Sequence, residues 1–275
     1  MASAHEQLRR SLARVIPEER LITDPLRRRA WASDASFYYL VPELVVVVES
    51  EAEVAALIRS CRRHGTPVTF RAAGTSLSGQ AVSDSVLAVL GDGWRDLKIL
   101  DDGKRIVLGP AVRGGQANEH LARFGRKLGP DPASIAAAMI GGIAANNASG
   151  MCCGTARNSY QTLSSLRLVL ADGTVLDTGD PESVTAFRST HAALLAALAD
   201  LGERTRRDLR LADRIRRKYQ IKNTTGYGLN ALVDFEDPVA ILEHLMIGSE
   251  GTLAFIAEIC YETVPEDPFK AAALV

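Results

Sequence analysis

Residues 71–80 read Arg-Ala-Ala-Gly-Thr-Ser-Leu-Ser-Gly-Gln, a loop of mostly small residues that follows the β-type run Pro67–Phe70. Its two glycines and short side chains leave backbone N–H groups accessible, as the binding of a phosphate or pyrophosphate by the main chain requires. The loop has neither the Lys-Ser/Thr ending of a P-loop nor the G-x-G-x-x-G spacing of a dinucleotide fingerprint. Taken alone, it fits either an anion-binding loop or a tight turn between two strands.

A second glycine-rich stretch favours the anion-binding interpretation. It combines Gly129-Pro-Asp-Pro-Ala-Ser134 with Ile140-Gly-Gly-Ile-Ala-Ala-Asn-Asn-Ala-Ser-Gly150. The two prolines fix the path of the chain, and Gly141-Gly142 allow a flat or bulky group to approach the backbone closely. Asn146 and Asn147 tolerate left-handed geometry and offer side-chain amides. Because the two loops are distant in sequence, they can form one site only through the fold.

The residues before the first loop predict a β-α-β unit. The apolar run Leu44–Val48 is typical of a buried strand, and Ser50 with Glu53 matches a capping box for a helix that ends at Gly65. A strand over Val68–Phe70 then presents the loop at its C-terminal end, where ligands bind in such folds.

Helices and strands alternate along the rest of the chain. Strands are predicted over Val86–Leu90, Leu97–Leu100, Arg105–Leu108, Leu166–Leu170, Val175–Asp177 and Thr252–Val264. Helices are predicted over Leu8–Ile16, Ala117–Leu128, Thr190–Leu211 and the segment that Asp237-Pro238 begins.

The composition is that of a globular enzyme domain. The 275 residues are 47% hydrophobic and 24% charged, and the net charge of −1 gives no general attraction to nucleic acid. The apolar run Leu44–Val48 is far too short to span a membrane, and the N-terminus has no signal-peptide pattern. A cytoplasmic location is therefore the default expectation, with a peripheral association with a membrane-bound electron acceptor left open.

Together, these motifs resemble the FAD-binding domain of the vanillyl-alcohol-oxidase and p-cresol-methylhydroxylase (PCMH-type) superfamily. The chain is most similar to D-lactate and D-2-hydroxyglutarate dehydrogenases, especially bacterial fusions in which an FAD-linked oxidase precedes an iron–sulfur module. The resemblance covers about residues 40–265. It rests, in the order of the family, on Arg71–Gln80, Pro130–Ser134, Gly141–Gly150, Ser149–Thr155, Lys222–Leu229 and Ile247–Leu253.

The resemblance implies an α+β fold in which two α/β lobes hold FAD between them. A helical segment over residues 1–40 would precede the FAD-binding domain at residues 41–265, whose lobes would cover about residues 41–92 and 93–265. Residues 266–275 would be a linker to a substrate (cap) domain that the chain lacks.

The resemblance also assigns cofactor-binding residues. The backbone N–H groups of Ala72 through Ser76 would hold the pyrophosphate, Ile256 would line the adenine pocket, and Tyr227 is a further candidate near the flavin. The complete set of assigned cofactor-binding residues is Arg71, Ala72, Ala73, Gly74, Thr75, Ser76, Gly79, Gln80, Pro132, Ser134, Gly141, Gly142, Asn146, Ser149, Cys152, Glu250, Gly251 and Ile256.

Relatives that attach FAD covalently often use the histidine of an Arg-x-x-Gly-His-Ser motif. Thr75 occupies that position here, so the resemblance predicts non-covalent FAD. The four cysteines lack the spacing of an iron–sulfur site, and no histidine cluster has metal-ligand spacing. Cys152 and Cys153 are interpreted as small residues of a cofactor loop, the alternative being a redox-active thiol beside the flavin.

The function that follows is that of the FAD-binding part of a dehydrogenase. The resemblance implies oxidation of a D-2-hydroxy acid by hydride transfer to FAD, with an iron–sulfur module or a quinone as electron acceptor. The substrate would bind through the missing cap domain, so no residue is assigned a catalytic role. The alternatives are an electron-transfer module without substrate specificity and a nicotinamide-using flavin reductase. The basic segment Arg204–Lys218 is either a solvated helix face or a surface for an anionic substrate or partner domain.

Overall fold

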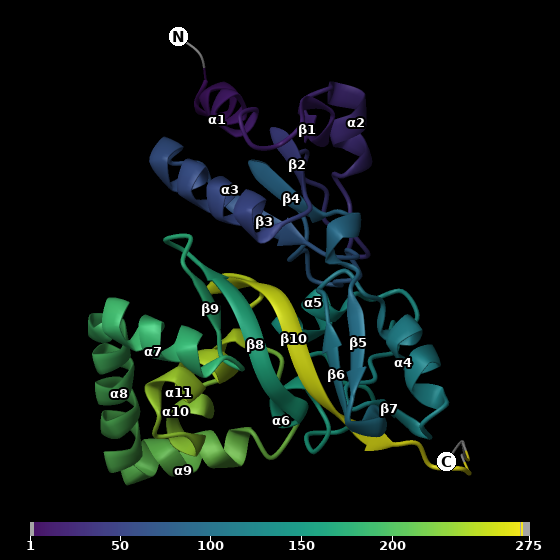
Figure 1. The fold of residues 1–275 in the computed structure, drawn as a ribbon, viewed down its shortest axis with the longest axis vertical. Coiled ribbons are helices and arrows are strands. Elements are labelled where there is room, and N and C mark those ends of the chain that lie inside the picture. The colour runs from purple at the N-terminus through teal and green to yellow at the C-terminus, as the bar shows by residue number, and fades with distance from the viewer. Residues whose placement is uncertain (1–2, 270, 272–275) are drawn as a thin grey trace.

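The computed structural model describes residues 3–269 and 271, which fold into two parts that meet end to end (Figure 1). A four-stranded sheet with the N-terminal helices forms one part, and a six-stranded sheet with the remaining helices forms the other. The α+β class is thereby confirmed.

Parallel strands make up most of the four-stranded sheet. Its strands lie in the order β1 (Leu21–Ile22), β2 (Leu44–Val48), β4 (Val86–Leu90) and β3 (Val68–Arg71). β2, β4 and β3 run parallel, and β1 pairs antiparallel with β2. Its helices are α1 (Ala4–Leu12), η1 (Glu18–Arg20), α2 (Pro25–Ala30) and α3 (Glu51–His64). Since β3 is the last strand of the sheet, the loop that follows it emerges at an edge.

Contacts at the start of α3 fix the connection between β2 and β3. Ser50 Oγ accepts a hydrogen bond from the backbone N–H of Glu53 at 3.3 Å, as a capping box requires. The carboxylate of Glu53 does not return to Ser50; it accepts from the backbone N–H of Glu49 at 2.7 Å. Arg20 Nη2 binds the same carboxylate at 2.6 Å, so a partly buried ion pair ties η1 to the helix start.

The six-stranded sheet is antiparallel and is built around its longest strand, β10. Its strands follow the order β5 (Leu97–Leu100), β6 (Arg105–Leu108), β10 (Ala254–Pro265), β8 (Leu163–Leu170) and β9 (Val175–Asp177), and β7 (Arg126–Leu128) also pairs with β10. Its helices are η2 (Asp92–Trp94), η3 (Asp101–Gly103), α4 (Gly114–Ala122), α5 (Ile140–Asn146), α6 (Ser159–Thr162), α7 (Pro181–Thr190), α8 (Ala192–Arg207), α9 (Leu209–Lys218), α10 (Ala231–Asp234) and α11 (Pro238–Met246). Buried side chains of α4, α5, α8, α10 and α11 share one hydrophobic core with β6, β8 and β10, and Figure 1 shows α4 near β5 and α8 at the opposite edge of the sheet.

The helix predicted over Ala117–Leu128 was wrong in its second half. α4 ends at Ala122, and Gly125 adopts a φ of 62° that reverses the chain. Leu128 then lies in β7, where it pairs with Thr263 of β10. The apolar spacing of the sequence fits a helix, but the long final strand supplies a pairing partner that local periodicity does not reveal.

The single helix predicted over Thr190–Leu211 was also wrong. Thr190 ends α7, and His191 begins the next helix with its ring stacked on Phe187 at 4.2 Å between ring centroids. A second break falls at Asp208, whose side chain accepts from the backbone N–H of Leu211 at 3.0 Å and caps α9.

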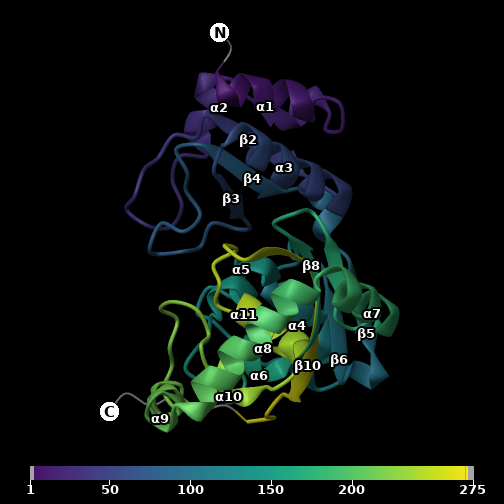
Figure 2. The same cartoon turned by 90° about the vertical axis from the view of Figure 1, so that its left-hand side faces the viewer.

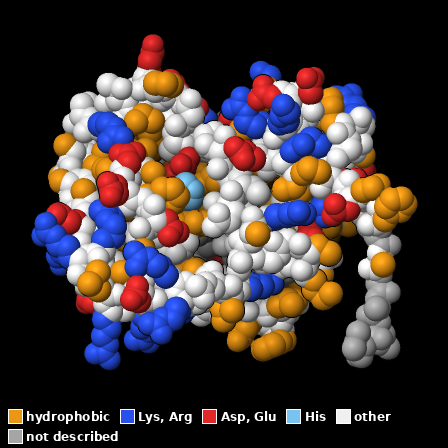
Figure 3. Space-filling model, turned by 90° about the horizontal axis from the view of Figure 1, so that it is seen from below, with side chains coloured by type: hydrophobic (Ala, Val, Ile, Leu, Met, Phe, Trp, Pro, Cys, Tyr) orange, Lys and Arg blue, Asp and Glu red, His pale blue; other side chains and the backbone are white. Residues whose placement is uncertain are grey.

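The basic segment Arg204–Lys218 forms a surface on which positive and negative side chains are intermixed. Seen from below in Figure 3, Lys and Arg side chains gather where α8 and α9 lie, with acidic side chains among them. Ion pairs join Arg204 to Asp200, Arg207 to Glu203 and Arg216 to Asp213. Within the described part of the chain, no helix has both the length and the apolar character that a membrane crossing requires.

An aromatic cluster joins the two sheets. Trp94, which is 6% exposed, donates its indole N–H to the carbonyl of Val48 in β2 at 2.8 Å. Its ring meets Phe255 of β10 edge-on, 5.1 Å between centroids, and Phe255 also packs against Phe70 of β3 at 4.9 Å. Phe255, a side chain of β10, therefore lies in the hydrophobic core of the four-stranded sheet.

We expect Trp94→Ala to lower the free energy of unfolding by about 3–5 kcal/mol, because it leaves a large cavity in this junction. Trp94→Phe should cost about 1–3 kcal/mol, since it keeps the ring but leaves the carbonyl of Val48 without its donor. Urea denaturation measures both values. Leu26→Ala, at a side chain that is 78% exposed, should change the value by less than about 0.5 kcal/mol. If Trp94→Ala and Leu26→Ala lowered the free energy of unfolding equally, the importance of the junction would be contradicted.

Candidate functional site

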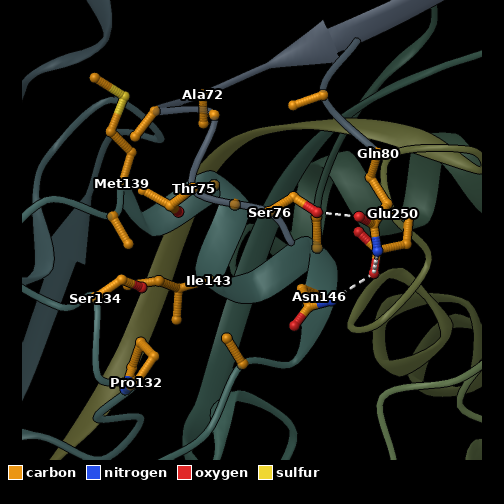
Figure 4. A pocket seen from close by; sticks show the side chains of 18 of the residues that line it. Ala72, Thr75, Ser76, Gln80, Pro132, Ser134, Met139, Ile143, Asn146 and Glu250 are labelled. Carbon is orange, nitrogen blue, oxygen red and sulfur yellow. Dashed lines mark hydrogen bonds between the residues drawn. The ribbon is translucent and has the colours of Figure 1, made fainter. Parts of the chain in front are cut away.

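A large cavity lies between the two sheets. Its volume of about 1060 Å³ is slightly above the roughly 300–1,000 Å³ typical of small-molecule sites. The walls come from the loop after β3, the segment 131–134, α5, residues 148–152 and the start of β10. Figure 4 shows side chains from these segments around the cavity, with Ala72 and Thr75 near Met139, and Pro132 and Ser134 near Ile143.

The loop after β3 is supported from beneath by Arg71. This side chain is 9% exposed, and Nη1 donates to the carbonyls of Ser33 at 2.8 Å, Trp31 at 3.3 Å and Ala81 at 3.4 Å. Burial lowers the pKa of Arg71, and the nearby carboxylate of Asp34 opposes that shift. The guanidinium stays charged because the ordinary pKa of arginine is so high. A fixed positive charge therefore lies behind the loop.

The loop itself offers unused donors. Gly74 has a φ of 70°, and its carbonyl accepts from the backbone N–H of Ala35 at 2.9 Å. Within the described part of the chain, no hydrogen bond engages the backbone N–H groups of Gly74, Thr75 and Ser76. Three free donors on a short turn above a buried cation form an arrangement suited to an anion. Figure 2 shows the segments before β2 and after β3 side by side on this flank.

The two adjacent glycines of α5 serve different purposes. A Cβ at Gly141 would lie 2.8 Å from the side chain of Pro110, so glycine is needed there for packing. A Cβ at Gly142 would meet only Ala72, at 3.6 Å, and Gly142 lines the cavity. At this position a side chain would take up space in the cavity rather than disturb the core.

The segment 149–153 is clamped at two points. Asp131 Oδ1 accepts from the backbone N–H groups of Gly150 at 3.1 Å and Cys153 at 3.2 Å. Lys222 Nζ donates to the carbonyl of Ser149 at 2.5 Å. Cys152 is exposed and lines the cavity, whereas Cys153 is buried and its burial raises the pKa of that thiol.

A polar cluster stands at the other side of the cavity (Figure 4). Glu250 Oε1 accepts from Asn146 Nδ2 at 2.6 Å and from Gln80 Nε2 at 3.4 Å. Burial raises the pKa of Glu250, and the two amide donors oppose that shift. The cluster joins the loop after β3, the end of α5 and the turn before β10.

The structure brings together nearly all the residues assigned from sequence. All of them line the cavity except Gly79, where a Cβ would lie 2.7 Å from the ring of Tyr38. Tyr227 is also outside the lining and shares a hydrogen bond with Thr252 at 3.0 Å. Lining residues that the sequence reasoning did not assign include Ala35, Asp131, Met139, Lys222, Thr224 and Phe255. Of these, Asp131, Lys222 and Thr224 lie within motifs that carried the resemblance, and that was the available signal.

Comparison with known proteins gives the family. The sequence profile of the FAD binding domain family matches residues 42–179, half of the chain. The chain belongs to this family. The glycolate oxidase subunit GlcD of Escherichia coli K12 is 34% identical over 146 residues, which cover 52% of this chain and 29% of GlcD.

Two further relatives align over most of the chain. The D-2-hydroxyglutarate dehydrogenase of Escherichia coli K12 is 27% identical over 84% of this chain and 23% of its own length. The D-lactate dehydrogenase of Archaeoglobus fulgidus is 27% identical over 81% of this chain and 39% of its own length. The chain thus spans between 23% and 39% of the length of these relatives.

Solved structures confirm the fold. Alkyldihydroxyacetonephosphate synthase superposes with a TM-score of 0.60 at 17% identity, covering 94% of this chain and 41% of the other. For 6-hydroxy-D-nicotine oxidase from Arthrobacter nicotinovorans the TM-score is 0.59 at 16% identity, covering 89% of this chain and 42% of the other. The predicted membership of the PCMH-type fold is confirmed.

The cavity fits FAD on its own physical features. Its volume suits a large cofactor, and the free N–H groups of Gly74 to Ser76 suit a pyrophosphate. Cavity-facing positions such as Ala72 and Gly142 carry minimal side chains. The residues present therefore agree with the family assignment.

We expect Gly74→Val to abolish FAD binding. A Cβ at this position would lie 2.6 Å from Nη2 of Arg71, and a β-branched residue resists a φ of 70°. Gly125→Val is the matched control, because Gly125 has a φ of 62° and nothing within 4 Å of its Cβ position. Titration with FAD, followed by flavin fluorescence, measures the effect. A folded Gly74→Val protein with normal FAD occupancy would contradict the placement of the loop.

Proposed function

We propose that this chain is the FAD-binding part of a dehydrogenase that oxidises a D-2-hydroxy acid of the lactate or 2-hydroxyglutarate type. The cavity between the two sheets, with its anion-binding loop, is the observation that carries the proposal. The names of the relatives that align over more than four-fifths of the chain support the substrate class. Their greater length supports the view that a substrate domain lies outside these residues.

The proposal assigns the cavity residues to parts of FAD. The N–H groups of residues 72–76 bind the pyrophosphate, and the charge of Arg71 supports them from behind. Ser134, Gly141 and Gly142 lie along the pyrophosphate, the ribityl chain or the ring edge, and Ile256 lines the adenine pocket. When bound, FAD supplies the hydride acceptor. The chain's own residues bind it, orient it and exclude water from it.

The charged side chains of the cavity are already engaged within the protein. Arg71 binds carbonyls, Asp131 binds backbone N–H groups, Lys222 binds the carbonyl of Ser149, and Glu250 binds two amides. Among the described residues no histidine lines the cavity. A hydroxy-acid substrate needs a cation for its carboxylate and a base for its hydroxyl proton. We infer that another domain supplies both groups.

The proposal includes the division of the chain and its surroundings. Residues 41–92 and 93–265 form the two lobes, residues 1–40 precede them, and residues 266–275 lead to the substrate domain. The electron acceptor is an iron–sulfur module or a quinone. The proposed location is the cytoplasm, with room for a peripheral contact with a membrane-bound acceptor.

FAD should be bound without a covalent link, because Thr75 offers no nitrogen for attachment to the flavin. Precipitation of the yellow protein with acid should therefore release the colour into the supernatant. Colour that stays in the pellet would disprove non-covalent binding, and Cys152 would then be the first candidate for the link, since it is exposed in the cavity.

Residues 1–275 loaded with FAD should not turn over D-lactate or D-2-hydroxyglutarate, because the carboxylate anchor and the base lie elsewhere. The longer chain that includes the substrate domain should oxidise one of them with an artificial dye as acceptor. Anaerobic bleaching of the flavin measures the first step, with dithionite as the positive control. Bleaching of residues 1–275 by a hydroxy acid would place the substrate site in this chain. Bleaching by NADPH would favour a nicotinamide-using reductase instead.

A further inference from the structure

Some cations of the basic segment Arg204–Lys218 differ from their neighbours in having no partner. The other arginines of the segment are held by carboxylates or, in the case of Arg206, by backbone carbonyls. Among the described residues, no hydrogen bond or ion pair engages the side chains of Arg210, Arg214, Arg217 and Lys218. Their charges are therefore available to a partner outside the chain.

Three of these cations form one stripe on α9. Arg210, Arg214 and Arg217 follow one another at the spacing i, i+4, i+7, which places them on the same face of a helix. The opposite face carries Ala212, which is 0% exposed, and Ile215, which is 5% exposed. The three arginines, called the arginine stripe from here on, are therefore turned away from the protein, and all three are exposed. The stripe spans about 10 Å along the helix axis.

Helix α9 lies across one end of the molecule. In Figure 1 it runs crosswise at the lower end, and in Figure 2, turned by 90°, it is seen nearly end-on at the same end. Figure 3 looks directly at this end and shows that Lys and Arg side chains gather there. A helix in this position can present its full length to a flat surface.

Exposed apolar side chains accompany the stripe. Successive residues of a helix are 100° apart, so Leu209 and Leu211 lie on either side of Arg210. Leu209 is 73% exposed, Leu211 is 41% exposed, and Ile221, just after the helix, is 71% exposed. Cations beside exposed leucines are typical of helices that lie in the interface of a membrane. A binding site for nucleic acid gains little from such apolar neighbours, because its main contacts are with phosphates.

The positive charge is local to this part of the chain. Residues 200–218 contain eight basic and four acidic side chains, whereas the whole chain has a net charge of −1. The basic excess at this end is therefore balanced by an acidic excess elsewhere. Near a negatively charged surface, such a distribution turns the basic end toward that surface.

We propose that the arginine stripe of α9 binds the surface of a membrane that contains anionic lipids. The guanidinium groups donate hydrogen bonds to lipid phosphates, and Leu209 and Leu211 enter the headgroup region. Since the apolar face of α9 stays buried in the protein, the helix lies on the membrane and does not insert into it. This contact goes beyond the proposed function and does not depend on bound FAD.

The triple variant Arg210→Gln/Arg214→Gln/Arg217→Gln tests the proposal. It should keep the fold, because the three side chains are exposed and make no ion pair among the described residues. Cosedimentation measures binding to vesicles of phosphatidylcholine with about a third of phosphatidylglycerol. The original protein should bind them at low salt, and neither high salt nor pure phosphatidylcholine should permit binding. The triple variant should bind about a hundredfold more weakly, because each cation near an anionic surface contributes a factor of about five.

The matched control is Arg27→Gln/Arg62→Gln/Arg63→Gln, which removes the same charge from exposed positions of α2 and α3. This control should bind the vesicles like the original protein. An equal loss in both triple variants would show a general effect of net charge and would overturn the inference. So would a failure of the original protein to bind the anionic vesicles at low salt. Binding to duplex DNA that the first triple variant loses, without binding to vesicles, would assign the stripe to nucleic acid instead. FAD titration of all three proteins separates these outcomes from a failure of the proposed function.

Discussion

The packing of Phe255 between Trp94 and Phe70 is the contact on which the rest of the structure depends. The two walls of the cavity belong to different sheets, and each wall alone would be an open surface. The aromatic cluster fixes the distance and the angle between the sheets, and the hydrogen bond from Trp94 to Val48 prevents them from sliding. A second contact between the two parts is the salt bridge between Arg167 of β8 and Glu51 at the start of α3. Only with both sheets in place do Ala72 and Gly142 face each other.

Much of the fold could be predicted because local signals agree with the final structure. The strands Leu97–Leu100 and Arg105–Leu108 have the predicted bounds, since an Asp-Asp-Gly turn separates two short apolar runs. The wrong predictions fall where residues distant in sequence, or a side-chain cap, determine the local structure. Leu128 has helical spacing, but β10 draws it into a sheet. The break at Asp208 depends on a side-chain cap whose signal is hidden in a charged, helix-favouring stretch.

The candidate site was predictable for a similar reason and to a similar limit. Its backbone geometry requires glycines and small residues, and these form motifs that are recognisable in the sequence. The side chains that hold this backbone in place do not form such recognisable motifs. Arg71 was predicted to bind the cofactor, whereas the contacts that the structure shows are those of its guanidinium with three carbonyls beneath the loop. The contacts of Asp131 and Lys222 join segments far apart in sequence, so no local pattern could reveal them.

The central position of β10 has a consequence for the order in which the molecule can assemble. All strands of the four-stranded sheet have left the ribosome once residue 90 is synthesised, because this sheet pairs with no later strand of the described residues. The six-stranded sheet has no middle until residues 254–265 arrive, because β6, β7 and β8 all pair with that strand. Until then their edges are unpaired and exposed to wrong partners. Strand β10 thus closes the sheet, brings Phe255 to the junction and completes the cavity in one step.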